Sequence, residues 1–272
     1  WEICCQTPGK KSGSIKIVEQ NQPLSVVNWH HRYKQQAGWS GDVRRYLFGK
    51  AAISPEDKIL EVGSGTGAVI SLVSDETDAK CYGIDIDIRS LLFSESRYPK
   101  IQLAAADGFH LPFPNNIFSI TYCHYLLLWV QDPLKILIEM ARVTKSGGYL
   151  IALAEPDYEA RIDYPLSLEK LGEMQTKSLV EQGMDPSMGR KLVGLFHKAG
   201  IQRVTSGILG AQWDQPATRE IDETEWIMIQ TDTADHLSPE ALAIYRKVEV
   251  NARRKGTRVL FIPTFYAAGI AP

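Results

Sequence analysis

Short apolar runs alternate with amphipathic segments through the first part of the chain. Five of these runs are apolar enough for buried strands: residues 58–62, 81–85, 101–105, 118–123 and 149–154. Between them, apolar side chains recur at helical intervals after Gly67 and over residues 88–98 and 133–143. This alternation predicts βαβ units and therefore an α/β fold with a mostly parallel sheet covered by helices on both faces.

The segments on either side are patterned less regularly. Helical spacing extends over residues 29–52, 166–181, 188–199 and most of 216–255. Strand patterns cover residues 202–213 and 258–267, and residues 268–272 are expected to form a tail. We expect a lead-in over residues 1–28 and one domain over residues 29–272. Residues 157–182 and 216–255 are expected to be insertions that cover a substrate.

Composition and charge narrow the class of protein. The 272 residues are 44% hydrophobic and 23% charged, with a formal net charge of -2, which is typical of a globular protein without a strongly basic face for nucleic acid. No apolar run approaches the ~20 residues of a membrane span. Cys81 and Cys123 fall in predicted strands, where a free thiol packs as a small apolar group. We expect a cytoplasmic protein without a metal, either a monomer or a homodimer.

A glycine-rich turn follows the first predicted strand. Residues 59–67 read ILEVGSGTG, so a buried strand leads into a turn where glycines allow sharp bending and close approach to a ligand. The spacing is G-x-G-x-G and differs from the G-x-G-x-x-G that seats a dinucleotide pyrophosphate. Glu61 precedes the first glycine, and an acid there suits a cationic ligand better than a diphosphate.

Two further acids follow the next two strands. Asp85 ends the second strand, where a carboxylate can accept hydrogen bonds from both hydroxyls of a ribose. Asp87 competes for this role two residues later, and we prefer Asp85 because it stands at the strand tip. Asp107 and Gly108 follow the third strand, where a carboxylate can accept from an adenine amine. The three acids together favour a nucleoside-containing, positively charged ligand.

The segments ILEVGSGTG, GIDID, AADGFHLPFPNNIFSI and DPLKILIEMARVTKSGGYL resemble successive motifs of class I S-adenosylmethionine (SAM)-dependent methyltransferases. The likeness is to the small-molecule kind, such as the ubiquinone and menaquinone methyltransferases, and is strong over residues 33–155. It implies a Rossmann-like seven-stranded sheet of order 3-2-1-4-5-7-6, whose last strand is antiparallel. It also implies SAM as methyl donor and S-adenosylhomocysteine as product.

The resemblance further implies a position for each site residue. It assigns the methionine end of SAM to Glu61, Gly63, Ser64 and Gly65, the ribose to Asp85, and the adenine to Ile86, Asp107 and Gly108. It assigns a lid helix to Tyr33 and Trp39, and the neighbourhood of the sulfonium and acceptor to His124.

Methyl transfer is an in-line displacement that depends mainly on alignment, and it needs a base only if the acceptor is protonated. Candidate bases follow the fourth and fifth strands: His124, Glu155 and Asp157. The alternative for His124 is a histidine that positions its loop, and for the two acids it is capping of the next segment.

Three other functions remain open from the sequence. The acceptor could be a protein or RNA, although neither a clear basic rim nor an appended recognition domain is present. The chain could be a SAM-binding regulatory module without turnover. An NAD-binding domain is the third alternative, which the glycine spacing disfavours.

Overall fold

The computed structural model describes residues 25–210 and 219–272. Most of the expected lead-in therefore lies outside the described residues. Its last part does not match the prediction, because helix α1 already begins at Val26 and continues to Trp39. Ser25 caps this helix by accepting a hydrogen bond from the backbone N–H of Asn28 at 3.2 Å.

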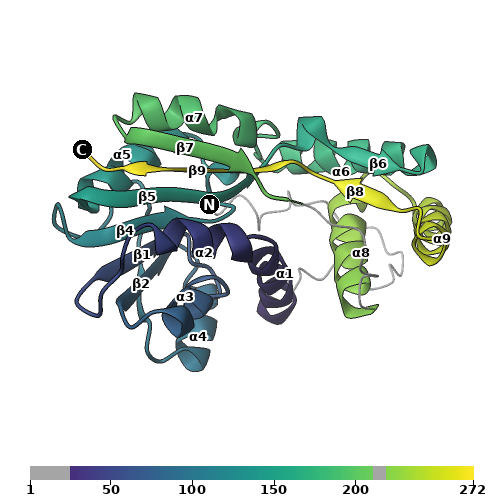
Figure 1. The fold of residues 1–272 in the computed structure, drawn as a ribbon. Coiled ribbons are helices and arrows are strands. Elements are labelled where there is room, and N and C mark those ends of the chain that lie inside the picture. Colours follow the sequence, from purple (N-terminus) through teal and green to yellow (C-terminus); the bar gives the residue numbers. More distant parts are fainter. Residues whose placement is uncertain (1–24, 211–218) are drawn as a thin grey trace, which may run out of the picture.

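A seven-stranded sheet forms the centre of the molecule (Figure 1). Its strands, in spatial order, are β3 (Gln102–Ala105), β2 (Lys80–Asp85), β1 (Lys58–Val62), β4 (Phe118–Cys123), β5 (Thr144–Pro156), β9 (Thr264–Ile270) and β7 (Gln202–Ile208). The first five strands in this spatial order are parallel to one another. Strand β9 pairs antiparallel with both β5 and β7. This confirms the implied order, in which the last strand of the chain lies between the fifth and sixth.

The end of the chain differs from the sequence prediction in one respect. The predicted strand over residues 258–267 is two strands, because Pro263 separates β8 (Val259–Phe261) from β9. Strand β8 pairs with β6 (Ile162–Tyr164) in a separate two-stranded sheet. Strand β9 continues to Ile270, so most of the expected tail belongs to the central sheet.

Helices cover both faces of the sheet, as expected. Helices α5 (Pro133–Val143) and α7 (Met188–Lys198) pack on one face, where they bury Leu60 and Val62 of β1. Helices α2 (Gly41–Gly49) and α3 (Ile70–Glu76) pack on the other face over Ile59. Side chains alternate between the two faces along a strand, so Glu61 lies on the same side as Ile59. Helix α4 (Ile88–Arg97) contacts β2 and β3.

A second group of elements lies beyond the end of the sheet at which β5 finishes (Figure 1). This outer lobe consists of β6, β8 and helices α6 (Glu169–Glu181), α8 (Arg219–Thr233) and α9 (Pro239–Arg254). It has a small core of its own, made by Leu168, Leu171, Ile229 and Leu242. Helix α8 packs against α6 and also against α1, and the second contact joins the lobe to helix α1 beside the central sheet. Within the described ranges, every helix is too short or too polar to cross a bilayer.

Candidate active site

The glycine-rich turn leaves the end of β1 in a conformation that needs glycine. Gly63, Gly65 and Gly67 have φ angles of 77°, 48° and 77°, in the left-handed region. The backbone N–H groups of Gly63 and Ser64 donate to the Ile84 carbonyl at 2.9 and 2.8 Å, which holds the turn against β2. A Cβ on Gly63 would come within 2.9 Å of Leu126. The backbone conformation and the close neighbours of the turn therefore both require glycine at these positions.

Asp85 and Asp87 have different partners, although they are two residues apart. The Asp85 carboxylate accepts the Gly65 N–H at 2.7 Å and the Asp87 N–H at 2.8 Å, so it faces the glycine turn. Burial raises its pKa. The Asp87 carboxylate instead caps α4 and accepts from the backbone N–H of Arg89 at 3.1 Å and the hydroxyl of Ser90 at 2.9 Å. This arrangement favours Asp85 over Asp87 as the ligand-binding acid.

Three other predicted residues lie near the ends of β2 and β3. Ile86 follows Asp85 and is 41% exposed, which leaves an apolar surface available to a flat ring. Asp107 is exposed and accepts the Phe109 N–H at 2.9 Å. A Cβ on Gly108 would meet the Ile136 side chain at 3.0 Å. The turn, Asp85 and Asp107 thus follow three adjacent strands in one row, where open α/β sheets bind ligands.

Glu61 lies beneath this row. It is 2% exposed and accepts a hydrogen bond from the Tyr122 hydroxyl of β4 at 3.0 Å. Burial raises its pKa to about 8, opposed by hydrogen bonds from Tyr122 and from the backbone N–H of Ile70. Glu61 therefore supports the turn from within the protein.

Helix α1 lies next to the glycine turn. The Tyr33 ring lies 3.5 Å from where a Cβ on Gly65 would be, and it stacks on Trp29 with ring centroids 5.7 Å apart. Trp39, at the end of the helix, is 45% exposed. Tyr33 is therefore placed at the turn as expected, and the structure brings Trp39 to the surface.

Sequence reasoning missed the residue that joins α1 to the turn. His30 is buried, and its Nδ1 lies 2.9 Å from the Thr66 hydroxyl oxygen, while Nε2 lies 3.4 Å from the Tyr98 hydroxyl. Burial lowers its pKa to about 4, so the ring is neutral at pH 7. In the sequence His30 is one polar residue of an amphipathic helix, and no local pattern links it to Thr66.

His124 is buried where α1 meets α2. Its Nε2 lies 3.2 Å from the Ser40 hydroxyl, which in turn donates to the Ala37 carbonyl at 3.2 Å. Burial and the charge of Arg44 lower its pKa to about 3. A buried imidazole with this partner favours the positioning interpretation over the interpretation as a base.

The two candidate acids after β5 have backbone partners. Glu155 is completely buried and accepts three backbone N–H groups, from Leu126, Leu127 and Leu128, at 2.9 to 3.1 Å. These residues begin the short helix η2 (Leu127–Trp129) after β4, so Glu155 accepts the free N–H groups at its start. Burial raises its pKa to about 7.

Asp157 is 1% exposed and has partners of its own. It accepts the Ala160 N–H at 3.2 Å and pairs with Arg190 of α7, with one N–O distance of 2.6 Å. Asp157 therefore caps the segment that follows it, whereas Glu155 binds the backbone of the earlier segment 126–128.

The backbone between β4 and η2 contains an uncommon conformation. Tyr125 has a φ of 52°, in the left-handed region that non-glycine residues rarely occupy. The Tyr125 N–H donates to the Ala154 carbonyl at 2.9 Å, and Glu155 holds the residues that follow. Such conformations persist where surrounding contacts hold them, and they cluster at functional sites.

Known proteins are similar to this chain in sequence. A family model described as a methyltransferase domain matches residues 60–152. A demethylmenaquinone methyltransferase of Lysinibacillus sphaericus is 29% identical over 193 residues, which covers 64% of this chain and 80% of that protein. Another demethylmenaquinone methyltransferase, of Corynebacterium urealyticum, is 35% identical over 130 residues, covering 48% of this chain and about half (53%) of that protein.

Solved structures are similar in fold. A geranyl diphosphate methyltransferase in complex with SAM superimposes with a TM-score of 0.55, covering 88% of this chain and 85% of that one at 13% sequence identity. At this identity the likeness establishes the architecture of the sheet and its helices.

Proposed function

The chain belongs to the class I SAM-dependent methyltransferases, and we propose that it transfers the methyl group of SAM to a small-molecule acceptor. One observation supports this proposal most directly. The glycine-rich turn at Gly65, the Asp85 carboxylate and the Asp107 carboxylate follow β1, β2 and β3, which are adjacent in the sheet. A nucleoside with an attached cationic chain fits such a row.

The residues present suit SAM. Asp85 would accept from the ribose hydroxyls, Ile86 would pack on the adenine ring, and Asp107 would accept from the adenine amine. The methionine end would lie along Gly63, Ser64 and Gly65, where Glu61 supports the turn, with Tyr33 beside it. SAM, when bound, supplies an electrophilic methyl group on a sulfonium.

The chain's own contribution to the displacement is alignment. Holding donor and acceptor in line can supply a large share of the rate acceleration. We assign the positioning of α1 and α2 to His124, the positioning of the strained turn at Tyr125 to Glu155, and the contact of β5 with α7 to Asp157. Each of these three side chains is buried and hydrogen-bonded within the protein.

The outer lobe is the proposed cover of the acceptor. It comprises most of the two segments expected to be insertions, 157–182 and 216–255, and its helix α8 contacts α1, which carries Tyr33. Relatives named demethylmenaquinone methyltransferase suggest a fused-ring quinol as the first acceptor to test.

Isothermal titration with SAM, S-adenosylhomocysteine and NAD tests the cofactor. We expect the first two to bind and NAD not to bind. Labelled methyl transfer from SAM to 1,4-dihydroxynaphthalene, and to a cell extract, then tests turnover. Absence of SAM binding would overturn the whole proposal. Binding without transfer to any acceptor would favour a regulatory module, and labelling of extract protein or RNA alone would overturn the small-molecule assignment.

A further inference from the structure

The loop between β3 and β4, residues 106–117, carries two of the proposed adenine residues, Asp107 and Gly108. This adenine loop begins beside the ribose site, because the Ala106 N–H donates to the backbone carbonyl of Asp85 at 3.0 Å. A Cβ on Gly108 would lie 3.3 Å from the Val62 side chain, so the loop also touches the strand that leads into the glycine turn. The start of the adenine loop therefore lies against both strands of the cofactor site.

A compact turn fixes the Asp107 side chain within this loop. Its Oδ1 accepts the Phe109 N–H at 2.9 Å, and its backbone carbonyl accepts the His110 N–H at 3.0 Å. The side chain is 48% exposed, and Oδ2 lies 3.9 Å from His110 Nδ1, beyond hydrogen-bond distance. One carboxylate oxygen is thus committed to the turn, and the other is accessible to a ligand.

An ion pair on helix α5 holds the far end of this turn. Glu139 Oε1 accepts the Leu111 N–H at 2.8 Å, and Arg142 Nη2 donates to the Leu111 carbonyl at 3.1 Å. Arg142 Nη1 also donates to the Phe113 carbonyl at 2.9 Å and to Asn115 Oδ1 at 2.7 Å. Both backbone polar groups of Leu111 are therefore bonded to the same ion pair.

The guanidinium of Arg142 is fully used in these contacts. Its Nε and Nη2 donate to the Glu139 carboxylate at 2.8 and 2.7 Å. Together with the three bonds to the adenine loop, they occupy all five N–H donors of the side chain. The hydrogen bond from Arg142 lowers the pKa of Glu139, which keeps the acid ionised at neutral pH. A lysine at this position could not span the same acceptors, because its three donors share one atom.

We infer that Arg142, together with Glu139, is a positioning residue for adenine recognition. It fixes the end of the turn at Leu111, so that the Asp107 carboxylate stays where it can accept the exocyclic amine of the purine. This rests on the proposed function, because it takes the ligand at Asp107 to be the adenosine of SAM. The specificity is for a 6-aminopurine over a 6-oxopurine, since a 6-oxo group is an acceptor and would oppose the carboxylate.

Two matched ligands test the inference by titration calorimetry on the full chain. S-adenosylhomocysteine carries the 6-amino group, and S-inosylhomocysteine carries a 6-oxo group on the same skeleton. We expect the parent protein to bind the first at least about tenfold more tightly. Absence of S-adenosylhomocysteine binding would overturn the proposed function. Equal binding of the two ligands would overturn the adenine assignment of Asp107, and with it this inference, while SAM remains the donor.

Arg142→Met is the central variant, because it leaves the Leu111 and Phe113 carbonyls without their donor. We expect the preference for S-adenosylhomocysteine to fall about threefold to tenfold, with S-inosylhomocysteine affinity changed by less than about twofold. Arg142→Lys keeps the charge without the fork and should lose nearly as much preference. Arg254→Met, at the exposed end of α9, is the matched control and should keep the parent preference. An unchanged preference in both Arg142 variants, or equal weakening of both ligands, would overturn the inference.

Asp107→Asn separates positioning from direct contact. The asparagine oxygen must accept from Phe109, so its NH2 group would face the ligand and the preference should vanish or reverse. If Arg142 acts through Asp107, adding Arg142→Met to this variant should change the preference by less than about twofold. A further loss as large as in the parent background would show that Arg142 acts by another route. The positioning role would then be wrong, and the proposed function would stand on the retained binding of S-adenosylhomocysteine.

Discussion

His30 Nδ1 lies 2.9 Å from the Thr66 hydroxyl oxygen, so a side chain of helix α1 is joined to the glycine turn. Thr66 is the residue between Gly65 and Gly67, and its side chain is completely buried. Helix α1 is therefore held at the turn by a specific polar contact in addition to the Tyr33 ring.

We predict that His30→Phe loosens α1 and weakens SAM binding. Phenylalanine keeps the ring contact with Phe93, whose centroid lies 4.9 Å from that of His30, but leaves the buried Thr66 hydroxyl without its partner. The dissociation constant for SAM should rise about threefold to tenfold, and stability should fall by ~1–2 kcal/mol. Titration calorimetry and thermal unfolding measure the two effects. His31→Phe, at an exposed neighbouring position, should leave both unchanged.

Asp85 and Asp87 provide a matched pair for the cofactor site. Asp85→Ala removes the carboxylate that faces the glycine turn, so we expect SAM affinity to fall by at least about tenfold. Asp87→Ala removes the cap of α4 and should cost ~1 kcal/mol of stability with less than about a threefold effect on SAM affinity. The assignment of the ribose to Asp85 would be wrong if the two variants bound SAM with reversed affinities.

The raised pKa of Glu61 predicts a pH dependence of stability. Its pKa is about 8 in the folded chain, against an ordinary value of 4.5, so the folded state retains a proton that the unfolded state loses. The stabilising effect is fully present below pH 4.5 and is lost as the pH rises through about 8. Relative to Glu61→Gln, which mimics the protonated acid, the parent should lose up to ~1.4 kcal/mol per pH unit in this window. Denaturant unfolding at several pH values measures the difference, and a constant difference would contradict the shift.

The order of the first five strands could be predicted from the sequence because each strand and helix has its own local pattern. Strands β1 to β5 were recognised as apolar runs, although β5 extends from Thr144 to Pro156 and so exceeds the predicted run on both sides. The division of residues 258–267 was not predicted. The apolar side chains before and after Pro263 look alike, and the pairing of β8 with β6 has no local signal in the sequence.

The site was predictable to a lesser extent. Asp85 was predicted from its place at the end of the strand next to β1, and its carboxylate does face the glycine turn. Glu155 also ends a parallel strand, yet it turns toward the N–H groups of residues 126–128. Sequence position does not distinguish a carboxylate that faces a ligand from one that faces a backbone turn. The hydrogen bond from Arg142 to the Leu111 carbonyl, 31 positions away, depends on how α5 packs beside the adenine loop and has no local signal.

Replacing Gly67 is expected to lower the free energy of unfolding for two separable reasons. Its φ of 77° strains any other residue, and a Cβ would overlap the Ser94 hydroxyl of α4. Gly67→Ala should therefore destabilise the chain by ~2–3 kcal/mol. Combining it with Ser94→Ala removes the overlap and leaves the backbone strain, so about half of the loss should return. Unfolding free energies of the four proteins form the cycle, and strictly additive effects would show that Ser94 is not involved.

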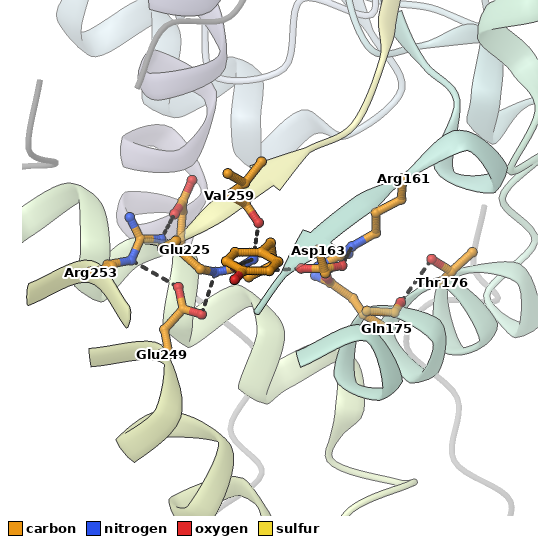
Figure 2. Close-up of polar contacts among 11 residues, drawn as sticks. Arg161, Asp163, Gln175, Thr176, Glu225, Glu249, Arg253 and Val259 are labelled. Carbon is orange, nitrogen blue, oxygen red and sulfur yellow. Dashed lines mark hydrogen bonds and ion pairs between the residues drawn. The ribbon is translucent and has the colours of Figure 1, made fainter. Parts of the chain in front are cut away.

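Arg258 is the centre of a charge network in the outer lobe. It is 8% exposed and pairs with Asp163 at 2.8 Å and Glu249 at 2.7 Å, so its loss leaves two buried carboxylates without this cation (Figure 2). Arg258→Met should cost ~3–5 kcal/mol, because breaking a buried pair on one side leaves an uncompensated charge. Arg254→Met removes an exposed arginine and should change stability by less than ~0.5 kcal/mol.

The part of the chain that loses protection in Arg258→Met shows whether the network stabilises the outer lobe alone or the whole chain. Arg258 joins β6 and α9, whereas the cofactor row lies on β1, β2 and β3. Amide hydrogen exchange of Arg258→Met should therefore increase in α6, α8 and α9 and stay near the parent level in the central sheet. Faster exchange across the whole sheet would show that the network stabilises the entire chain rather than the outer lobe.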